Sequence, residues 1–127
     1  MDRMELIDLT RRFIDAFNRN DLDAMMGFFA ADGVYEEFNG RRNVGKDAIR
    51  AAFTPQFTGA FGTMQFLDED LFVDAGSGKV MASWRCTLSV KGQPTSWRGL
   101  DLLHFVDGML AAKLTYAKTK VPQFEDR

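Results

Sequence analysis

Apolar residues recur at helical spacing near the start of the chain, with charged residues between them. This pattern is typical of an amphipathic helix, and its apolar positions are Leu6, Leu9, Phe13, Ile14 and Phe17. A polar cluster at residues 18–21 interrupts the pattern and offers side chains that cap helices. A second apolar stripe follows, at Leu22, Met25, Met26 and Phe29. Together the two stripes predict a helical hairpin.

The next part of the chain predicts a short strand and a third helix. Residues 34–38 have the composition of a short strand, which the Asn39-Gly40 turn ends. Residues 46–53 predict a short helix with Ile49 and Phe53 on one side, and Pro55 helps to end it.

From Met64 onward the apolar pattern changes to a period of two, which predicts three strands in an antiparallel meander. Turn signals accompany them at residues 74–78, 91–94 and 107–108. Because the helices precede the strands, the pattern indicates the α+β class. A chain of 127 residues has the length of one ordinary domain. We therefore expect a single domain over residues 1–127.

The turns also predict which strand residues share a face. A two-residue loop at 92–93 would place Trp84 opposite Asp101. A two-residue turn at Asp107-Gly108 would place Leu114 opposite Asp101, with Tyr116 on the diagonal. The face that carries Asp101 is then otherwise apolar, with Trp84, Cys86, Leu88, Trp97, Leu103 and Leu114 on it.

Asp101 is the strongest candidate for a functional residue, because its surroundings are apolar. A carboxylate in such surroundings either finds a partner or takes up a proton, and a protonated carboxyl can donate a hydrogen bond. Two interpretations follow: a buried carboxyl satisfied by Trp84 or Tyr116, or the same group also facing a ligand. On the opposite face of this strand, Leu100 and Leu102 are apolar too. A strand with two apolar faces indicates a homodimer through the outer face of the sheet.

The composition excludes several classes of function. The chain has 16 basic and 18 acidic residues, so no strong field attracts nucleic acid or an anionic membrane. We find no signal-peptide pattern and no run of about 18 apolar residues, and we expect a cytoplasmic protein. The single cysteine, Cys86, excludes an internal disulfide, and the single histidine, His104, lacks the neighbours of a zinc site. We expect neither a metal nor a cofactor.

Five segments are distinctive in combination: 12–18 (RFIDAFN), 20–23 (NDLD), 28–34 (FFAADGV), 44–50 (VGKDAIR) and 99–108 (GLDLLHFVDG). With them the chain resembles the nuclear transport factor 2-like superfamily, and within it the ketosteroid isomerase and polyketide cyclase (SnoaL-like) branch. The resemblance implies a cone-shaped α+β fold, in which three N-terminal helices pack over the concave face of a curved antiparallel sheet. It says less about chemistry, because the superfamily holds many enzymes and many members without catalysis.

The resemblance also implies roles for individual residues. The general base of the isomerase falls on Glu37, and the protonated aspartate of its oxyanion hole falls on Asp101. The base moves a proton between carbons next to a carbonyl, while uncharged donors stabilise the enolate oxygen. The tyrosine of the oxyanion hole falls on Phe13, which has no hydroxyl. A replacement donor would have to come from Tyr116, Tyr35 or Trp84.

These observations combine into one hypothesis and one alternative. The hypothesis is a dimeric acid-base enzyme that acts on a hydrophobic carbonyl metabolite, with Asp101, Glu37 and Tyr116 as catalytic residues. The alternative is a non-catalytic ligand-binding or dimerisation domain, and Glu37 is then one of a solvated acidic pair at a strand edge. In both cases the expected partner is a small hydrophobic ligand, in a pocket lined by Phe13, Phe17, Tyr35, Trp84, Cys86, Leu88, Trp97, Leu103 and Leu114.

Overall fold

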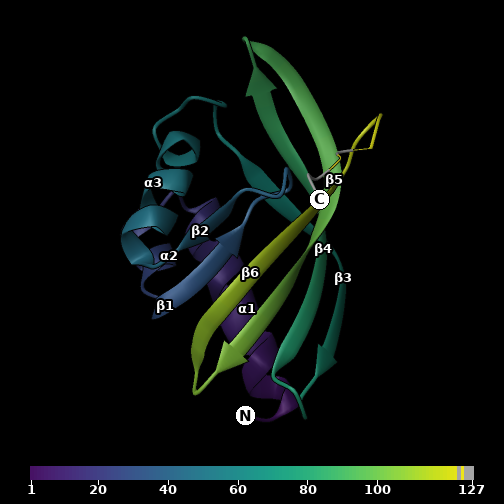
Figure 1. Ribbon diagram of the computed structural model, residues 1–127. Helices are drawn as coiled ribbons and strands as arrows, with labels where there is room; N and C mark the ends of the chain where they lie inside the picture. The colour runs from purple at the N-terminus through teal and green to yellow at the C-terminus, as the bar shows by residue number, and fades with distance from the viewer. Residues whose placement is uncertain (123, 125–127) are drawn as a thin grey trace.

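A curved sheet of six strands forms the frame of the chain, and helices lie along one of its faces (Figure 1). The computed structural model describes residues 1–122 and 124. The elements in chain order are α1 (Arg3–Asn18), α2 (Leu22–Met26), β1 (Phe29–Glu36), β2 (Arg42–Val44), α3 (Lys46–Phe57), β3 (Gln65–Asp74), β4 (Lys79–Val90), β5 (Gln93–Val106) and β6 (Met109–Lys118). The α+β class and the order of helices before the long strands are as predicted.

The strand order across the sheet is β2-β1-β6-β5-β4-β3. Four of the neighbouring pairs are antiparallel, whereas β1 runs parallel to β6. The helix α1 contacts β3 and β4, and α3 contacts β1 and β2. The two helices therefore pack toward opposite edges of the sheet. No helix in the described part of the chain is long and apolar enough to cross a membrane.

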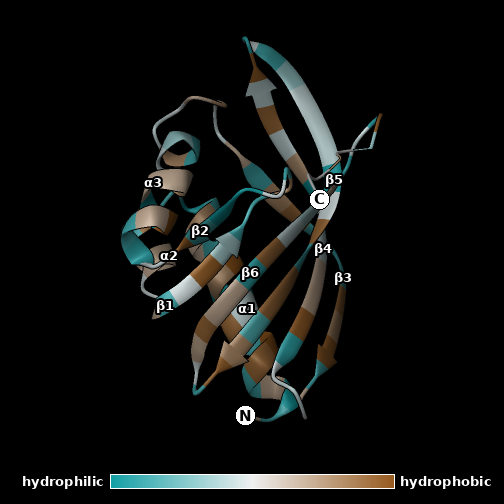
Figure 2. Cartoon of the chain, in the orientation of Figure 1, coloured by the Kyte–Doolittle hydropathy of each residue, from teal (hydrophilic) through white to brown (hydrophobic). Residues whose placement is uncertain are grey.

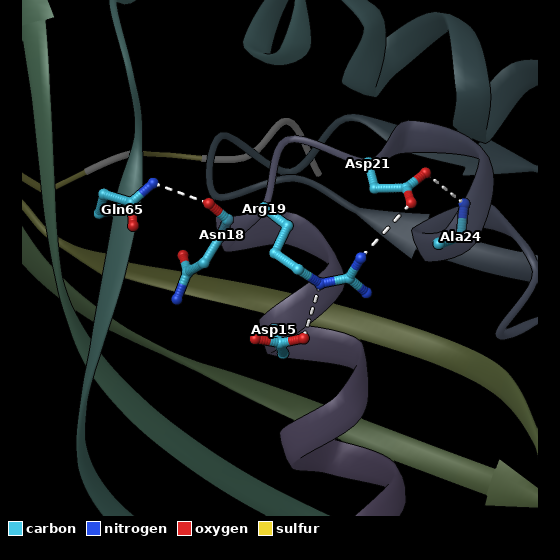
Figure 3. Close-up of polar contacts among 6 residues, drawn as sticks. All are labelled: Asp15, Asn18, Arg19, Asp21, Ala24 and Gln65. Atoms are coloured by element: carbon cyan, nitrogen blue, oxygen red, sulfur yellow. Dashed lines mark hydrogen bonds and ion pairs between the residues drawn. The ribbon is translucent and has the colours of Figure 1, made fainter.

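The corner between α1 and α2 is held by polar side chains (Figure 3). Arg19 donates to Asp15 at 2.7 Å and lies 3.6 Å from Asp21. The carboxylate of Asp21 accepts from the backbone of Ala24 at 3.0 Å, which caps α2. The carbonyl oxygen of Asn18 accepts from Gln65 at 3.0 Å, so the end of α1 is tied to β3.

The hydrophobic core lies between the helices and the concave face. Phe13 meets Phe29 edge to face at 5.8 Å between ring centroids, and Phe17 meets Phe66 at 4.7 Å. These contacts join α1 to β1 and β3. Hydrophobic positions alternate with polar ones along the strands, and β5 becomes paler toward its hairpin with β4 (Figure 2). This end of the sheet extends beyond the core.

Three predictions about the elements need correction. The second helix ends at Met26, and Phe29 begins β1, which is longer than the predicted 34–38 strand. Four strands follow Met64 instead of three, because 65–74 forms an edge strand of its own, with a register shift between Asp68 and Leu71. The third helix continues past Pro55 to Phe57, since the proline lies close to its end.

The β4–β5 register differs from the predicted one by two residues. The turn is at Lys91-Gly92, where both residues have positive φ (51° and 77°), as a tight two-residue hairpin requires. Trp84 therefore lies opposite Gly99, and Asp101 lies opposite Ala82. A shift of two residues keeps every side chain on its face. Trp84 and Asp101 consequently share the concave face, as predicted.

The β5–β6 register contains a one-residue bulge that changes the site. The Asp107-Gly108 turn is as predicted, with Val106 opposite Met109 and Phe105 opposite Leu110. His104, however, lies opposite Ala112, so Ala111 is an extra residue in β6. Beyond the bulge each side chain of β6 faces the opposite way from the prediction. Asp101 pairs with Thr115 instead of Leu114, and Leu100, on the outer face, pairs with Tyr116.

Candidate functional site

A cavity of about 440 Å³ lies between α3, the loop after it and the concave face of the sheet. Most of its wall is apolar and aromatic, and is formed by Phe38, Ala52, Pro55, Phe61, Met64, Phe66, Trp84, Leu88, Val90 and Trp97. Six polar residues complete the lining: Tyr35, Glu37, Gln56, Thr95, Lys113 and Thr115. This combination of an apolar wall with a few polar groups is typical of a small-molecule site.

Three of the polar residues lie on two neighbouring strands, and Glu37 directly follows one of them, β1. Tyr35 on β1 lies directly beside Lys113 on β6 in the parallel pair. Thr115 follows Lys113 by two positions, so both side chains point to the same face of β6, and the Asn43 side chain donates to both the Tyr35 carbonyl and the Glu37 carboxylate. The polar part of the cavity wall is therefore a compact patch at the β1–β6 seam. We call Tyr35, Glu37, Lys113 and Thr115 the seam patch.

Asp101 lies behind this patch, where it accepts hydrogen bonds on both carboxylate oxygens. Lys113 donates to Oδ1 at 2.9 Å and Thr115 donates to Oδ1 at 2.7 Å. The indole of Trp84 donates to Oδ2 at 3.2 Å. Because every contact is made by a donor, Asp101 acts here as an acceptor and a counter-ion. The buried carboxylate is therefore satisfied by hydrogen bonds, as in the first of the two interpretations of the sequence. Trp84 is one of its donors.

Gly99 allows Trp84 to reach Asp101. A Cβ atom at Gly99 would come within 2.5 Å of the Trp84 ring and 2.4 Å of the Tyr116 carbonyl oxygen. Real Cβ atoms do not approach other atoms so closely, so the indole occupies the space that a side chain at this position would need. The glycine thereby makes a diagonal hydrogen bond possible between neighbouring strands.

Lys113 is a buried ammonium with an unusual set of neighbours. Its residue is 8% exposed, and Nζ lies 2.7 Å from the Thr115 hydroxyl and 4.7 Å from the centroid of the Tyr35 ring. Burial lowers the pKa of this amine, but the charge of Asp101, supported by Tyr35 and Glu37, outweighs burial and leaves the pKa raised. The side chain is therefore charged throughout the neutral range.

Tyr35 and Glu37 complete the seam patch. Tyr35 stacks on Phe53 with 4.2 Å between ring centroids. Burial raises the pKa of its phenol, and Asp101 and Glu37 add to the rise although Lys113 opposes it. The Glu37 carboxylate accepts on Oε2 from Asn43 at 3.0 Å and lies 3.9 Å from Arg41. Its Oε1 has no hydrogen-bond partner among residues 1–122 and 124. The patch thus offers a neutral hydroxyl, an ammonium and one free carboxylate oxygen.

Comparison with known proteins places this architecture in a family. The family model described as "SnoaL-like domain" matches residues 10–113. The chain belongs to the SnoaL-like domain family. Its fold is that of the nuclear transport factor 2-like superfamily, as the sequence resemblance implied. A comparison with curated proteins finds no match.

Solved structures share the fold of this SnoaL-like domain at low sequence identity. A candidate polyketide cyclase from Xanthomonas campestris pv. campestris is 23% identical, with a TM-score of 0.80 and 90% of each chain covered. A candidate polyketide cyclase from Silicibacter sp. TM1040 is 20% identical, with a TM-score of 0.78, covering 89% of this chain and 88% of the other. An NTF2-like protein of unknown function from Mesorhizobium loti is 25% identical, with a TM-score of 0.77 and coverages of 94% and 96%.

The structure gathers only part of the predicted site of this SnoaL-like domain. Five predicted residues line the cavity: Tyr35, Glu37, Trp84, Leu88 and Trp97. Asp101 contacts three lining residues from behind. Four predicted pocket residues belong instead to the hydrophobic core, namely Phe13, Phe17, Cys86 and Leu103. Burial raises the pKa of the Cys86 thiol to about 11, so it stays protonated at neutral pH.

The predicted positions of Tyr116 and Leu114 are wrong, and both errors have one cause. Tyr116 is 51% exposed and lies on the outer face of the sheet. Leu114 shares that face, because the bulge at Ala111 reverses the direction of every later residue of β6. The same reversal turns Lys113 and Thr115 inward, and the sequence reasoning missed both. The register predicted from the Asp107-Gly108 turn left them on the opposite face, and no local signal marks the bulge.

The described residues also limit what the site can hold. Within residues 1–122 and 124, no group of three or more His, Cys, Asp and Glu side chains is placed to hold a metal ion. The polar side chains of the lining include a carboxylate at Glu37, a phenol at Tyr35 and an ammonium at Lys113.

Proposed function

We propose that this SnoaL-like domain is a small-molecule acid-base enzyme that acts on a hydrophobic carbonyl compound in the 440 Å³ cavity. The observation that carries the proposal is the free Oε1 of Glu37 in the polar part of a largely apolar and aromatic cavity wall. A carboxylate oxygen without a hydrogen-bond partner in the wall of a ligand cavity can accept a proton from a bound C–H group, as general base catalysis needs.

The reaction we propose is a proton transfer next to the carbonyl group. Glu37 Oε1 takes a proton from the carbon beside the carbonyl, and the C–H electron pair moves to form an enolate. In a ketone with a double bond between its β and γ carbons, the protonated Glu37 then returns the proton to the γ carbon as the enolate electrons shift back to restore the carbonyl, so that atoms and charge balance. The neutral hydroxyl of Tyr35 supplies a donor toward the carbonyl oxygen. Of the three replacement donors suggested by the sequence, Tyr35 is the one we retain, because Trp84 donates to Asp101 and Tyr116 lies outside.

This proposal modifies the role that the family resemblance implied for Asp101. An oxyanion-hole carboxyl must be protonated and must aim its proton at the ligand. Asp101 instead accepts from Trp84, Lys113 and Thr115. We therefore propose that Asp101 positions Lys113 and Trp84 in the cavity wall. The structural neighbours support only the fold, because their sequence identity to this chain is low.

Hydrogen–deuterium exchange of bound ketones tests the proposal. Apolar cyclic ketones that raise the melting temperature are first selected by thermal shift, and exchange of their α-protons in D₂O is followed by NMR. We expect the domain to accelerate exchange, and Glu37→Gln to reduce the acceleration by about 10²-fold or more. Glu36→Gln is the matched control, because Glu36 precedes Glu37 but pairs with Arg42 at 3.6 Å. Equal exchange rates for Glu37→Gln and the wild type would refute the role of Glu37.

The alternative function is ligand binding without catalysis in the same cavity. The absence of a hydroxyl at Phe13 favours it, because the family tyrosine is replaced by a core residue that packs on Phe28 and Phe29. Ketones that bind but show no accelerated exchange would support this alternative.

We also propose that two copies pair through the outer face of the sheet. Apolar side chains gather there around Leu100 and Leu102 on β5, with Met81 and Phe72 in the neighbouring strands. Phe72 is 66% exposed, which is costly for a large apolar group. Sedimentation at micromolar concentration should give a dimer for the wild type and a monomer for Leu102→Lys. A wild-type monomer would contradict the pairing.

A further inference from the structure

We propose that Lys113 is an oxyanion-binding residue, and that the natural ligand is an apolar ring compound with one acidic oxygen that binds as its anion. This inference rests on the proposed use of the cavity as a ligand site, but not on catalysis by Glu37. The ligand class includes enols and phenols, whose oxygen becomes negative when the proton leaves.

The Lys113 ammonium has more donor positions than it has acceptors in the described residues. Two of its three ammonium protons go to Asp101 at 2.9 Å and Thr115 at 2.7 Å. The third has no acceptor among residues 1–122 and 124, although Lys113 is part of the cavity lining. An ammonium that is buried and only partly satisfied is costly. A ligand oxygen at this point would satisfy it.

The charge of Lys113 is held in a fixed position. Lysine side chains are flexible, and a mobile ammonium is a poor recognition element. Here Asp101 fixes the ammonium from behind, Thr115 fixes it from the side and Tyr35 covers it at 4.7 Å. A preorganised cation in a largely apolar wall is an arrangement that stabilises a negative oxygen strongly. The raised pKa of Lys113 excludes the amine as a nucleophile at neutral pH.

The charges of the site also bear on the state of a bound ligand. Asp101 is balanced by Lys113, and Glu37 lies 3.9 Å from Arg41. A ligand anion would add one negative charge beside Glu37, unless the proton lost by the ligand stays on Glu37. Transfer of the proton from the ligand to Glu37 leaves the total charge unchanged. The bound state is then a ligand anion at Lys113 with a neutral Glu37 next to it.

A coloured naphthol tests the inference directly. The probe is 4-nitro-1-naphthol, whose anion and neutral form have different absorption spectra, and 1-nitronaphthalene is the matched neutral ring. Below the pKa of the free naphthol, we expect the wild type to bind it with the spectrum of the anion. Lys118→Met is the control, because Lys118 is exposed near the end of β6. It should bind the anion as the wild type does.

Two variants separate the contribution of Lys113 from that of folding. Lys113→Met leaves Asp101 without its cation and is expected to be unstable, so Asp101→Asn/Lys113→Met removes both charges together. This double variant should still bind 1-nitronaphthalene and should lose the preference for the anion by about tenfold or more. Glu37→Gln, which resembles the proton-loaded carboxyl, should bind the anion more tightly than the wild type.

Each result decides the inference. Anion binding that disappears in the double variant supports it. Binding of the neutral naphthol by the wild type, or an anion preference that persists in the double variant, overturns it. Failure of both ring compounds to bind also overturns the ligand class. The exchange experiment on Glu37 is independent of these outcomes, because it measures C–H chemistry and not the state of the ligand oxygen.

Discussion

Asp101 and Lys113 form an ion pair in which both side chains are only 9% exposed. Removing two charges from water costs several kcal/mol for each ion, and the pair is tolerated only where further hydrogen bonds satisfy it. Trp84 and Thr115 supply those bonds to Asp101. Removing either side chain would leave the other as a buried charge without its partner, and this would lower the free energy of unfolding.

We predict that Asp101→Asn and Lys113→Met each lower the free energy of unfolding by about 3 to 5 kcal/mol, because each leaves a buried group without its partner. The double variant should lose clearly less than the sum of the two single losses. Urea unfolding followed by tryptophan fluorescence measures all three values. Additive losses would show that the two charges do not interact.

At the scale of elements, the bulge in β6 decides which side chains face the cavity. Ala111 is the extra residue, and the register changes across it between the Phe105–Leu110 and His104–Ala112 pairs. One inserted residue is enough to turn Lys113 and Thr115 inward and Tyr116 outward. The parallel pairing of β6 with β1 then brings Lys113 beside Tyr35. The β6 half of the seam patch, Lys113 and Thr115, is a product of this bulge.

The sequence predicts the elements and the concave face of β4 and β5, because both depend on local patterns. The predicted β4–β5 pairing is wrong by two residues, but a shift of two residues keeps Trp84 and Asp101 on their common face. The bulge could not be predicted in the same way, because alanine at 111 carries no turn signal. Glu37 was found through the family resemblance, and Lys113 required the three-dimensional register. Local pattern therefore predicts the fold well and the polar half of the cavity poorly.

Deletion of Ala111 should remove the bulge and reverse the faces of the remaining part of β6. Lys113 and Thr115 would turn outward and leave Asp101 without two of its three donors, while Leu114 would turn inward. We expect a loss of more than about 4 kcal/mol in the free energy of unfolding, or no cooperative transition at all. Near-ultraviolet circular dichroism and urea unfolding measure the effect. The control is Ala111→Ser, which keeps the number of residues and should have a free energy of unfolding within about 1 kcal/mol of the wild type. A stable deletion variant that still binds the anion would contradict the role of the bulge.

At the scale of the whole molecule, the cavity exists because the sheet is longer than its helical cover. The helix α1 fills one end of the concave face with aromatic side chains, and α3 contacts the β1–β2 edge. Residues from β1, α3, β3, β4, β5 and β6 all contribute to the lining. A site assembled from so many elements is complete only in the folded chain. Its titrating groups are therefore linked to the stability of the whole fold.

The pH dependence of unfolding follows from Tyr35 and Lys113. Burial raises the pKa of Tyr35 above its ordinary value of 10.0. For Lys113, burial acts in the opposite direction, but the charge of Asp101 outweighs it and raises the pKa above 10.5. The folded chain therefore retains both protons at a pH where the unfolded chain loses them. The stabilisation is fully present below the ordinary values and is lost as the pH rises through the folded ones.

We accordingly predict that the free energy of unfolding falls steeply as the pH rises above about 10. Tyr35→Phe and the Asp101→Asn/Lys113→Met double variant should each flatten this fall, because each removes a proton that the folded state holds preferentially. The chain has two tyrosines, so Tyr116→Phe leaves Tyr35 as the only phenol and makes its titration visible as phenolate absorbance. In that variant the native protein should titrate above 10.0, the ordinary value. A phenol that titrates at the ordinary value, or a fall in stability that persists unchanged in Tyr35→Phe, would mean that the β1–β6 seam does not hold this proton. The burial of the seam patch, on which the proposed anion site depends, would then be wrong as well.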